Sequence, residues 1–156
     1  QRVIRVMPNT PMTLGKGFCG MSGGKFAEPE DLAWVEKMLS SSSLVIVVPE
    51  DQQDAVTALS GSGPAYFFLM VEAMAEAGKK LGLSESDALR AAKEVLIGAA
   101  AMVEKSGKDP KTLRENVTSP NGTTFAALTT FNSEGFVEVV YRAMKAARDR
   151  SVELSS

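Results

Sequence analysis

The residue types that could do chemistry gather in one loop, residues 115–128, which reads ENVTSPNGTTFAAL. Asn121 and Gly122 both tolerate a positive φ, so a turn is expected there. Thr123 and Thr124 then fall at the start of an apolar helix, where free backbone N–H groups and the helix dipole can hold a small anion such as a carboxylate. A threonine hydroxyl can bond a second polar atom of the same ligand. The pattern is also that of an ordinary N-cap, and the residues alone favour that simpler interpretation.

Histidine is absent from the 156 residues, which excludes several kinds of catalysis. A Ser-His-Asp triad, an HExxH zinc site and imidazole acid–base catalysis cannot be built. The single cysteine, Cys19, excludes an internal disulfide and a cysteine-based metal cluster, and no histidine can activate it as a nucleophile. We therefore expect no metal site, and any chemistry must use backbone amides, hydroxyls, carboxylates or a bound cofactor.

The stretch GSGPAY, residues 61–66, begins like the dinucleotide fingerprint GxGxxG but does not fit it. Tyr66 stands at the third glycine position, Pro64 follows the second glycine, and the preceding residues are helix-like where that fingerprint requires a strand. A tight turn into a helix that begins with proline is expected instead. Residues 21–26, MSGGKF, likewise lack the spacing of a P-loop.

A second turn, Pro8-Asn9-Thr10-Pro11, directly follows a predicted strand. Ligands of open α/β sheets collect at the carboxyl ends of strands, which makes Asn9 a candidate. A plain turn explains the same residues equally well.

The elements that must position these motifs fall into two regions. Up to about residue 50, β-type runs alternate with one helix, whereas from residue 51 helix signals dominate. The fold class predicted is α/β followed by all-α, with domains at residues 1–50 and 51–156. The predicted strands are 3–7, 17–21 and 44–48, and the predicted helices are 29–39, 50–59, 64–81, 85–106, 110–116, 124–131 and 135–153.

Several of these elements carry a more specific expectation. The strand at 44–48 is apolar throughout, as in a strand covered on both faces. Trp34 is expected to pack, and Ser133 to cap the last helix. The helix that begins at Pro64 is apolar almost all round, so we expect it to be buried in a large core or between subunits.

Composition excludes further classes of protein. With 17 basic and 19 acidic residues, there is no electrostatic case for nucleic acid or an anionic membrane as a partner. The longest apolar run, residues 64–71, is too short to cross a bilayer, and no signal peptide is visible. We expect a soluble protein of the reducing cytoplasm. Because Gln1 lies almost within a predicted strand, we also expect that an upstream part of a larger polypeptide is missing.

Three stretches in this order and spacing resemble 1-pyrroline-5-carboxylate reductase: RVMPNTP (5–11), LSGSGPAYFF (59–68) and ENVTSPNGTT (115–124). The last predicted helix, residues 135–154, is also similar to that family. The resemblance covers essentially the whole chain. It implies the last step of proline biosynthesis, in which NADPH or NADH transfers a hydride to 1-pyrroline-5-carboxylate to give L-proline. It also implies the tail of a Rossmann-type domain, followed by a helical domain that forms a homodimer or a larger homo-oligomer.

The resemblance implies roles for eight residues. Thr124 is the catalytic residue, whose hydroxyl meets the ring nitrogen of the substrate. Those of the substrate loop, which hold the carboxylate largely through backbone N–H groups, are Ser119, Asn121, Gly122, Thr123 and Thr124; those on the cofactor side are Asn9, Glu50 and Asn116. Asn121 stands where the family usually has glycine, and we expect the loop to survive because Asn can adopt the left-handed conformation.

Two alternatives to this reductase remain open. One is an oligomerisation module of a truncated protein without activity of its own, and the other is a related imine or β-hydroxyacid reductase. Such reductases usually rely on a lysine in a helix of the second domain. The candidates Lys79, Lys80 and Lys93 fall at exposed-looking helical positions, which disfavours the second alternative.

Overall fold

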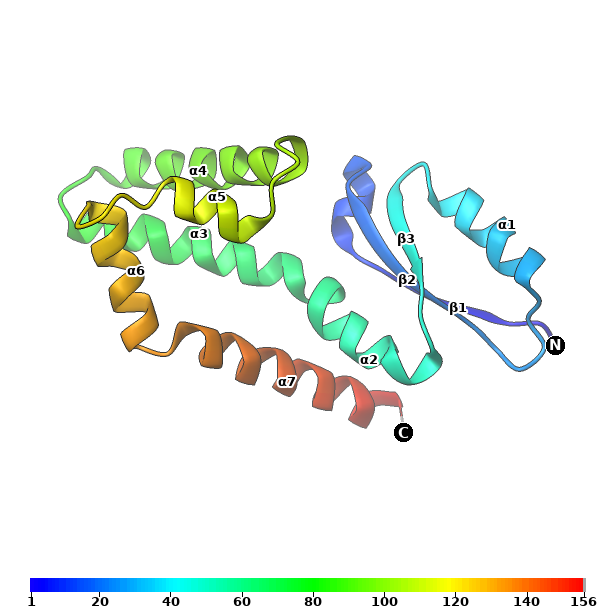
Figure 1. The fold of residues 1–156 in the computed structure, drawn as a ribbon. Coiled ribbons are helices and arrows are strands. Elements are labelled where there is room, and N and C mark those ends of the chain that lie inside the picture. Colours follow the sequence, from blue (N-terminus) through cyan, green and yellow to red (C-terminus); the bar gives the residue numbers. More distant parts are fainter. Residues whose placement is uncertain (156) are drawn as a thin grey trace. The chain divides into compact units, whose positions relative to one another are not determined.

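A computed structural model describes residues 1–155, and Figure 1 shows its ribbon. By contacts the chain divides into two compact units: the first holds Gln1–Tyr66 and the chain from Tyr141 onward, and the second is Phe67–Val140. The predicted order of a small sheet followed by helices is confirmed. The contact division falls elsewhere than at residue 50, and the two domains expected from composition stay a prediction.

The first unit contains a mixed three-stranded sheet. Its strands are β1 (Ile4–Pro8), β2 (Gly17–Gly23) and β3 (Ser43–Val47), in the spatial order β1-β2-β3. β1 is antiparallel to β2 and pairs its last residue, Pro8, with Cys19, whereas β3 is parallel to β2 and pairs Val47 with Met21. The carboxyl ends of β1 and β3 therefore lie at opposite ends of the sheet.

Helix α1 (Pro29–Leu39) contacts β2 and β3 and has the predicted bounds. Its start is a capping box in which the carboxylates of Glu28 and Asp31 each bond a backbone N–H of the other residue. Trp34, however, is 62% exposed, so the expectation that it packs is wrong: it lies on the outer side of α1.

The composition of strand β3 predicts a strand that is covered on both faces, but the structure does not cover it in this way. Leu44 and Ile46, which share one face by the two-residue period of a strand, are 67% and 38% exposed. β3 is an edge strand of this sheet, and among the described residues no strand lies beyond it.

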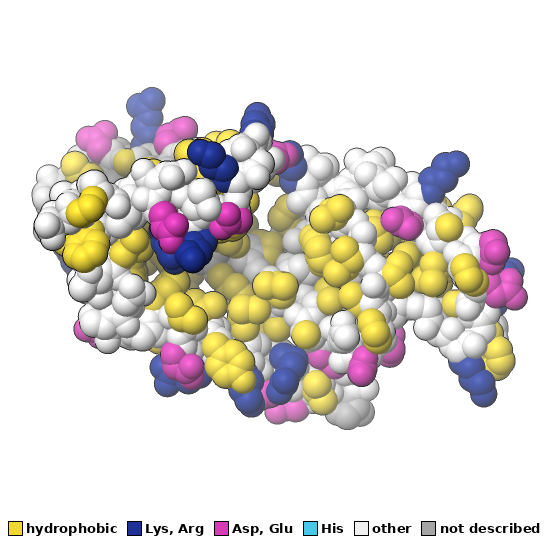
Figure 2. All heavy atoms as spheres, viewed as in Figure 1, with side chains coloured by type: hydrophobic (Ala, Val, Ile, Leu, Met, Phe, Trp, Pro, Cys, Tyr) yellow, Lys and Arg dark blue, Asp and Glu magenta, His cyan; other side chains and the backbone are white. Residues whose placement is uncertain are grey.

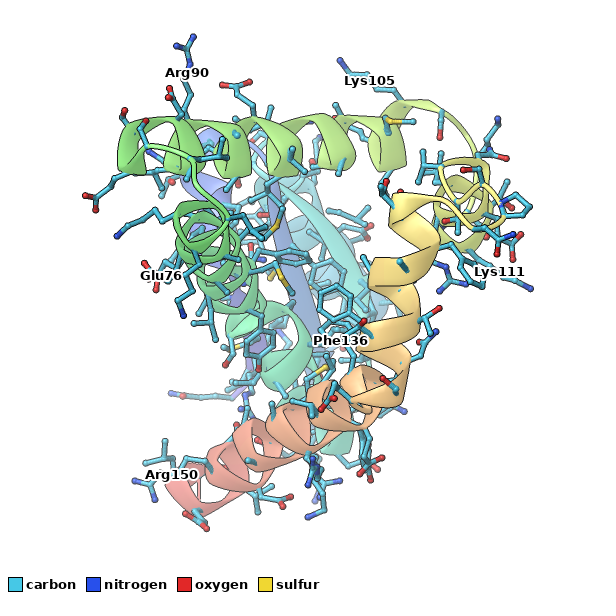
Figure 3. All side chains as sticks on the ribbon, turned by 90° about the vertical axis from the view of Figure 1, so that its left-hand side faces the viewer. Glu76, Arg90, Lys105, Lys111, Phe136 and Arg150 are labelled. Carbon is cyan, nitrogen blue, oxygen red and sulfur yellow. The ribbon has the colours of Figure 1, made fainter. Side chains whose placement is uncertain are left out.

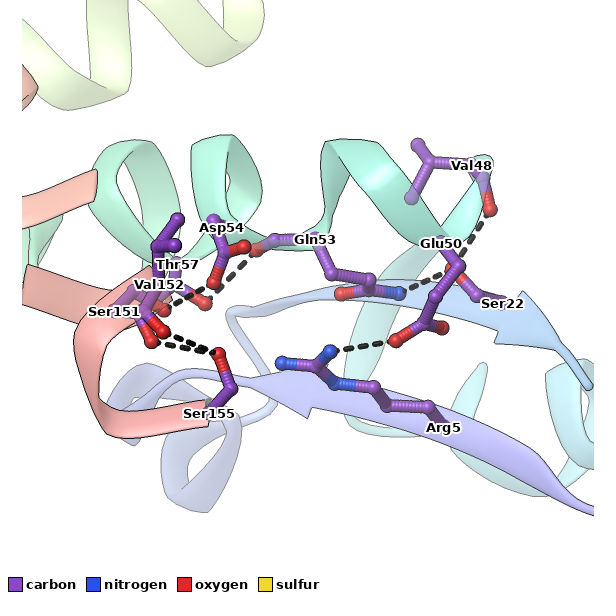
Figure 4. A network of polar contacts seen from close by, with 10 residues as sticks. All are labelled: Arg5, Ser22, Val48, Glu50, Gln53, Asp54, Thr57, Ser151, Val152 and Ser155. Atoms are coloured by element: carbon purple, nitrogen blue, oxygen red, sulfur yellow. Dashed lines mark hydrogen bonds and ion pairs between the residues drawn. The ribbon is translucent and has the colours of Figure 1, made fainter. Parts of the chain in front are cut away.

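A buried polar network joins β2 to the helical segment that follows β3 (Figure 4). Gln53 and Ser22 are 0% and 1% exposed, and Gln53 Nε2 donates to Ser22 Oγ at 2.6 Å. Ser22 Oγ in turn donates to the Val48 carbonyl at 2.7 Å, while the Val48 N–H donates to the Met21 carbonyl at 2.8 Å. Both polar groups of the Val48 peptide unit are thus held by β2.

The helical segment itself changes pitch along its length. It runs as a 3₁₀ turn, η2 (Glu50–Gln52), an α-helical turn, α2 (Gln53–Val56), and a π-helical turn, η3 (Thr57–Gly61). Ser151, near the end of the chain, donates from Oγ to Asp54 Oδ1 at 2.5 Å and fixes the last helix to this segment (Figure 4).

The remaining helices are α3 (Gly63–Lys80), α4 (Glu85–Lys105), α5 (Pro110–Asn116), α6 (Thr123–Ser133) and α7 (Phe136–Ser155). Local residues explain where they begin: Ser84 Oγ accepts the Asp87 N–H at 3.1 Å and caps α4, and Asp109 caps α5. Gly82 and Gly107, at φ +103° and +68°, end α3 and α4 as predicted.

Ser133 does not cap the last helix, so that expectation is wrong. α6 continues two residues further than predicted and includes Ser133, whose Oγ donates back to the Thr130 carbonyl at 2.9 Å. Gly135, at φ +70°, makes the turn between α6 and α7 instead. Beside this turn, the rings of Phe131 and Phe136 meet edge to face with centroids 5.3 Å apart; Figure 3 labels Phe136.

The second unit buries few large side chains. Among its described residues, the buried hydrophobic ones are alanines: Ala75, Ala88 and Ala92. Charged side chains such as Glu76 and Arg90 extend away from the ribbon in Figure 3, as expected for a solvated surface. Large apolar groups are exposed as well, and Figure 2 shows hydrophobic side chains spread over the visible face.

Close packing of β2 on the helical segment gives a test of the first unit. A Cβ added at Gly20 would lie 2.6 Å from Val56 Cγ1, a buried branched side chain. We expect Gly20→Ala to lower the free energy of unfolding by about 1–3 kcal/mol, measured by denaturant titration. The same substitution in a Val56→Ala background should cost clearly less, because the clashing methyl groups are gone. Equal losses of stability in both backgrounds would show that Val56 does not restrict the side chain at residue 20.

Candidate functional site

The loop before α6 forms a tight turn. The Gly122 N–H donates to the Ser119 carbonyl at 3.0 Å, and Asn121 is the one described non-glycine residue with a positive φ, at +59°. Asn tolerates this left-handed conformation better than most residues do, as expected from the sequence. Gly122 then adopts an extended conformation, with φ −78° and ψ 175°, and is the N-cap of α6.

Gly122 leaves the start of α6 open. A Cβ at this position would lie 2.4 Å from Ser119 Oγ and 3.1 Å from the Ser119 carbonyl oxygen, so the turn has no room for a side chain. No side chain caps the helix, unlike α4 and α5, and the first N–H groups of a helix have no acceptor within it. The ordinary side-chain N-cap that the residues alone favour is therefore not formed.

The threonine hydroxyls around this loop differ in whether they already have a hydrogen-bond partner within the chain. Thr118, Thr129 and Thr130 each donate to a backbone carbonyl four residues earlier, at 2.6, 2.9 and 3.2 Å. Four residues before Thr124 is Pro120, and among the described contacts the half-buried Thr124 hydroxyl bonds nothing. A hydroxyl and several N–H groups at one helix start thus remain available to a polar molecule.

The end of α5 supports the loop from the other side. The N–H groups of Val117 and Thr118 donate to the carbonyls of Arg114 and Glu115 at 3.3 and 3.0 Å, which ends the helix in a tight turn. Asn116, the last residue of α5, is exposed. Between α5 and α6 lies an open pocket of about 330 Å³, lined by Arg114, Glu115, Thr118, Phe125, Leu128, Thr129 and Asn132.

The two candidates in the first unit are not brought together. Asn9 follows β1 beside Phe18, while Glu50 lies beside Arg5, which pairs with Ser22 in the sheet. Phe18 and Ser22 are separated by four residues of extended strand, roughly 13 Å. Since β1 is antiparallel to β3, one strand end cannot present both residues to a single ligand.

Both of these side chains already have partners within the chain. Glu50 Oε1 accepts from Arg5 Nη1 at 2.6 Å in an exposed ion pair, of the kind that contributes little to stability. Asn9 Nδ2 donates to the Ser60 carbonyl at 3.2 Å, and Asn9 Oδ1 accepts the Phe18 N–H at 2.9 Å. The sequence pattern does not predict Arg5 as the partner of Glu50 or Ser60 as the partner of Asn9. For Ser60 a signal exists: Pro64, four residues later, has no N–H to offer its carbonyl.

Other classes of site find no support in residues 1–155. No group of three or more Cys, Asp or Glu side chains could hold a metal ion there, and no helix there is long and apolar enough to cross a membrane. Cys19 is fully buried, and this burial raises the pKa of its thiol, which keeps it protonated and unreactive.

Comparisons with known proteins agree with this architecture. The family model described as pyrroline-5-carboxylate reductase dimerisation matches residues 50–154. Proteins named pyrroline-5-carboxylate reductase are 47% identical in Corynebacterium melassecola and 45% identical in Arabidopsis thaliana, over 97% and 99% of this chain and 56% of each relative.

Solved structures give the same result. A pyrroline-5-carboxylate reductase from Coxiella burnetii has a TM-score of 0.93 at 38% identity, covering 100% of this chain and 58% of that one. A pyrroline carboxylate reductase from Plasmodium falciparum, solved with NADP bound, has a TM-score of 0.88 at 31% identity, covering 100% of this chain and 63% of that one.

The fold is thus that of reductases in which a strand-containing region leads into a helical dimerisation region. The chain belongs to the pyrroline-5-carboxylate reductase family. It spans a little more than half the length of the curated relatives it matches.

The backbone of the loop can be tested at Asn121. Its positive φ disfavours β-branched residues, so Asn121→Val should lower the free energy of unfolding by about 1–2 kcal/mol, measured by denaturant titration. Asn121→Gly is the matched control, since glycine adopts this conformation freely, and it should retain the stability of the parent within about 0.5 kcal/mol. A valine variant as stable as the glycine variant would contradict the left-handed turn.

Proposed function

We propose that this chain takes part in the reduction of 1-pyrroline-5-carboxylate to L-proline by hydride transfer from NADPH or NADH, and that it supplies the substrate loop. The observation that carries the proposal is the open start of α6, where an uncapped helix end and the unengaged Thr124 hydroxyl lie together. The names of the relatives support the choice of substrate.

The loop suits a cyclic imine that bears a carboxylate. The N–H groups at the start of α6, with the helix dipole behind them, hold the carboxylate, and the absence of a side chain at Gly122 lets it approach. The Thr124 hydroxyl meets the ring nitrogen and fixes the face that the ring presents. A protonated imine already accepts hydride readily, so the absence of histidine from the chain is compatible with this reaction.

The dinucleotide would supply the hydride, but the residues present do not form a site for it. Of the three candidates, Asn9 and Glu50 are engaged within the chain, and Asn116 alone has a side chain without an internal bond among the described contacts. NADP is bound in the Plasmodium falciparum relative, which is longer than this chain. We propose that dinucleotide binding falls mainly to the part of the relatives that this chain does not span.

We also propose that the second unit pairs with another copy of this chain. Phe67, Phe68 and Leu69 on α3 are 60%, 59% and 64% exposed, although soluble monomers rarely expose large apolar patches. The description of the matching family model as a dimerisation domain supports this assignment. A second copy would cover these three side chains and complete the core that alanines alone do not fill.

The structure favours the alternative of a related imine or β-hydroxyacid reductase less, whereas the alternative of an inactive oligomerisation module needs an experiment. Lys79, Lys80 and Lys93, the candidates for a lysine-dependent reductase, are all exposed, and the side-chain hydrogen bond to Glu76 raises the pKa of Lys79. The alternative of an inactive oligomerisation module is tested by assaying NADPH-dependent proline formation in a polypeptide of the relatives' full length that carries this chain, called below the full-length polypeptide.

Thr124 provides the sharpest test of the loop. In the full-length polypeptide, Thr124→Val should lower kcat/KM for the imine by about 10- to 150-fold, because a hydrogen bond to a charged ligand contributes about 1.5–3 kcal/mol. Thr130→Val is the control: its hydroxyl bonds only the Ala126 carbonyl in the same helix, and activity should stay within about threefold. A Thr124→Val enzyme within about twofold of the parent would remove Thr124 from the site.

Phe68 tests the pairing of copies. A glutamate at this position would place a charge in the proposed interface, so Phe68→Glu should dissociate the oligomer, measured by sedimentation, with helix content checked by circular dichroism. Leu14→Glu, which changes an 83% exposed residue of the other unit, should leave the oligomer intact. An intact and active oligomer of Phe68→Glu would show that α3 does not lie in the interface.

A further inference from the structure

The turn before α3 has an unusual geometry. The Ser62 N–H donates to the Thr57 carbonyl at 2.9 Å, five residues earlier, which defines the π-helical turn η3 (Thr57–Gly61). Single π turns are rare and often lie at functional sites. This one runs into the stretch LSGSGPAY, residues 59–66, and ends shortly before the helix that begins at Gly63.

Pro64 leaves one carbonyl of this turn without its helical partner. A helical carbonyl normally accepts the N–H four residues later, and for Ser60 that residue is Pro64, which has none. The next N–H, that of Ala65, donates to the Ser62 carbonyl at 3.0 Å. Ser60 is only 9% exposed, so water cannot readily replace the missing donor.

Asn9 supplies the missing hydrogen bond. Its Nδ2 reaches the Ser60 carbonyl at 3.2 Å across 51 residues of sequence. Its Oδ1 accepts the Phe18 N–H at 2.9 Å, and because that partner is a donor and the other an acceptor, the orientation of the amide is determined. Both ends of the side chain are therefore committed, one to the sheet and one to the turn.

Other contacts hold the turn against β1 and α3. A Cβ added at Gly61 would lie 2.7 Å from Met7 Cε, so the turn lies against the end of the Met7 side chain of β1. Tyr66 donates from its hydroxyl to the Ala58 carbonyl at 2.9 Å, and Ser60 Oγ donates to the Val56 carbonyl at 2.8 Å. The Asn9–Ser60 bond is the one of these contacts that replaces an interaction removed by proline.

We propose that Asn9 is a positioning residue for the proposed reaction, which fixes the turn Ser60–Gly63 by supplying the hydrogen bond that Pro64 cannot, and that its side chain does not bind the dinucleotide. The functional part of this inference depends on the proposed reductase activity. Hydride transfer depends strongly on alignment, so a loosened turn lowers kcat while the affinity for the dinucleotide is retained. A direct ligand of the dinucleotide would show the opposite pattern.

Asn9→Asp in the full-length polypeptide separates these roles. Aspartate keeps an acceptor for the Phe18 N–H but has no donor for the Ser60 carbonyl. We expect kcat to fall about tenfold and the Kd for NADPH, measured by fluorescence titration, to stay within about twofold. Thr10→Ala, at the exposed neighbouring residue, is the control and should match the parent. A raised Kd with unchanged kcat would overturn the proposal and make Asn9 a dinucleotide ligand.

Pro64→Ala gives a rescue that a dinucleotide-binding role of Asn9 would not predict. Alanine restores an N–H four residues after Ser60, so the double variant Asn9→Asp/Pro64→Ala should recover kcat to within about threefold of Pro64→Ala alone. If Asn9→Asp does not fold by itself, the proposal still requires the double variant to fold and to be active. A double variant no better than Asn9→Asp would overturn it.

Amide hydrogen exchange distinguishes failure of this inference from failure of the proposed function. The Ser62 N–H should exchange faster in Asn9→Asp and return to the parent rate in the double variant, whether or not the protein is a reductase. A parent protein without NADPH-dependent activity would reject the proposed function alone. Unchanged exchange at Ser62 in Asn9→Asp would reject the role of Asn9 alone.

Discussion

The polar chain from Gln53 through Ser22 to the Val48 carbonyl is the constraint on which the arrangement of the first unit depends. It is buried, so its hydrogen bonds act in a low dielectric and cannot be exchanged for bonds to water. Gln53 Oε1 has no partner among the described residues, a cost that an apolar side chain would avoid. In return, the amide determines where the helical segment starts relative to β2, and the later contacts of Val56, Ser60 and Asn9 follow from that position.

The proposed substrate loop, Ser119–Thr124, shows the opposite use of polar groups. In the first unit the buried Ser22 and Ser60 hydroxyls and the Gln53 Nε2 donor each have a partner, whereas at the start of α6 the turn leaves donors without partners. Gly122 is essential to this difference, since it occupies the N-cap position with no side chain to satisfy the helix end. An open helix end is the kind of site that can hold a small anion through backbone N–H groups, and it needs no ionisable side chain to do so.

Local signals in the sequence predict most of the helices and their ends, because caps, glycines and prolines act over a few residues. α1 has the predicted bounds, and Gly82 and Gly107 end their helices as expected. The misses depend on neighbouring elements: Leu44 in β3 is exposed because no described element covers its side chain, and Ser133 donates back to the Thr130 carbonyl because α6 extends to it. For the candidate site, the sequence and the family resemblance predict that the loop residues lie together. No local pattern predicts the antiparallel direction of β1, which separates Asn9 from Glu50.

The bond between Ser151 and Asp54 has a consequence for the order of events during synthesis. It joins residues 97 positions apart, and it belongs to a unit whose two segments are interrupted by the whole of the other unit. A ribosome releases Asp54 long before Ser151, so the strands wait for their last helix while the helices of Phe67–Val140 can already form from local contacts. Of these two units, the one whose synthesis starts earlier is thus the one that is completed later.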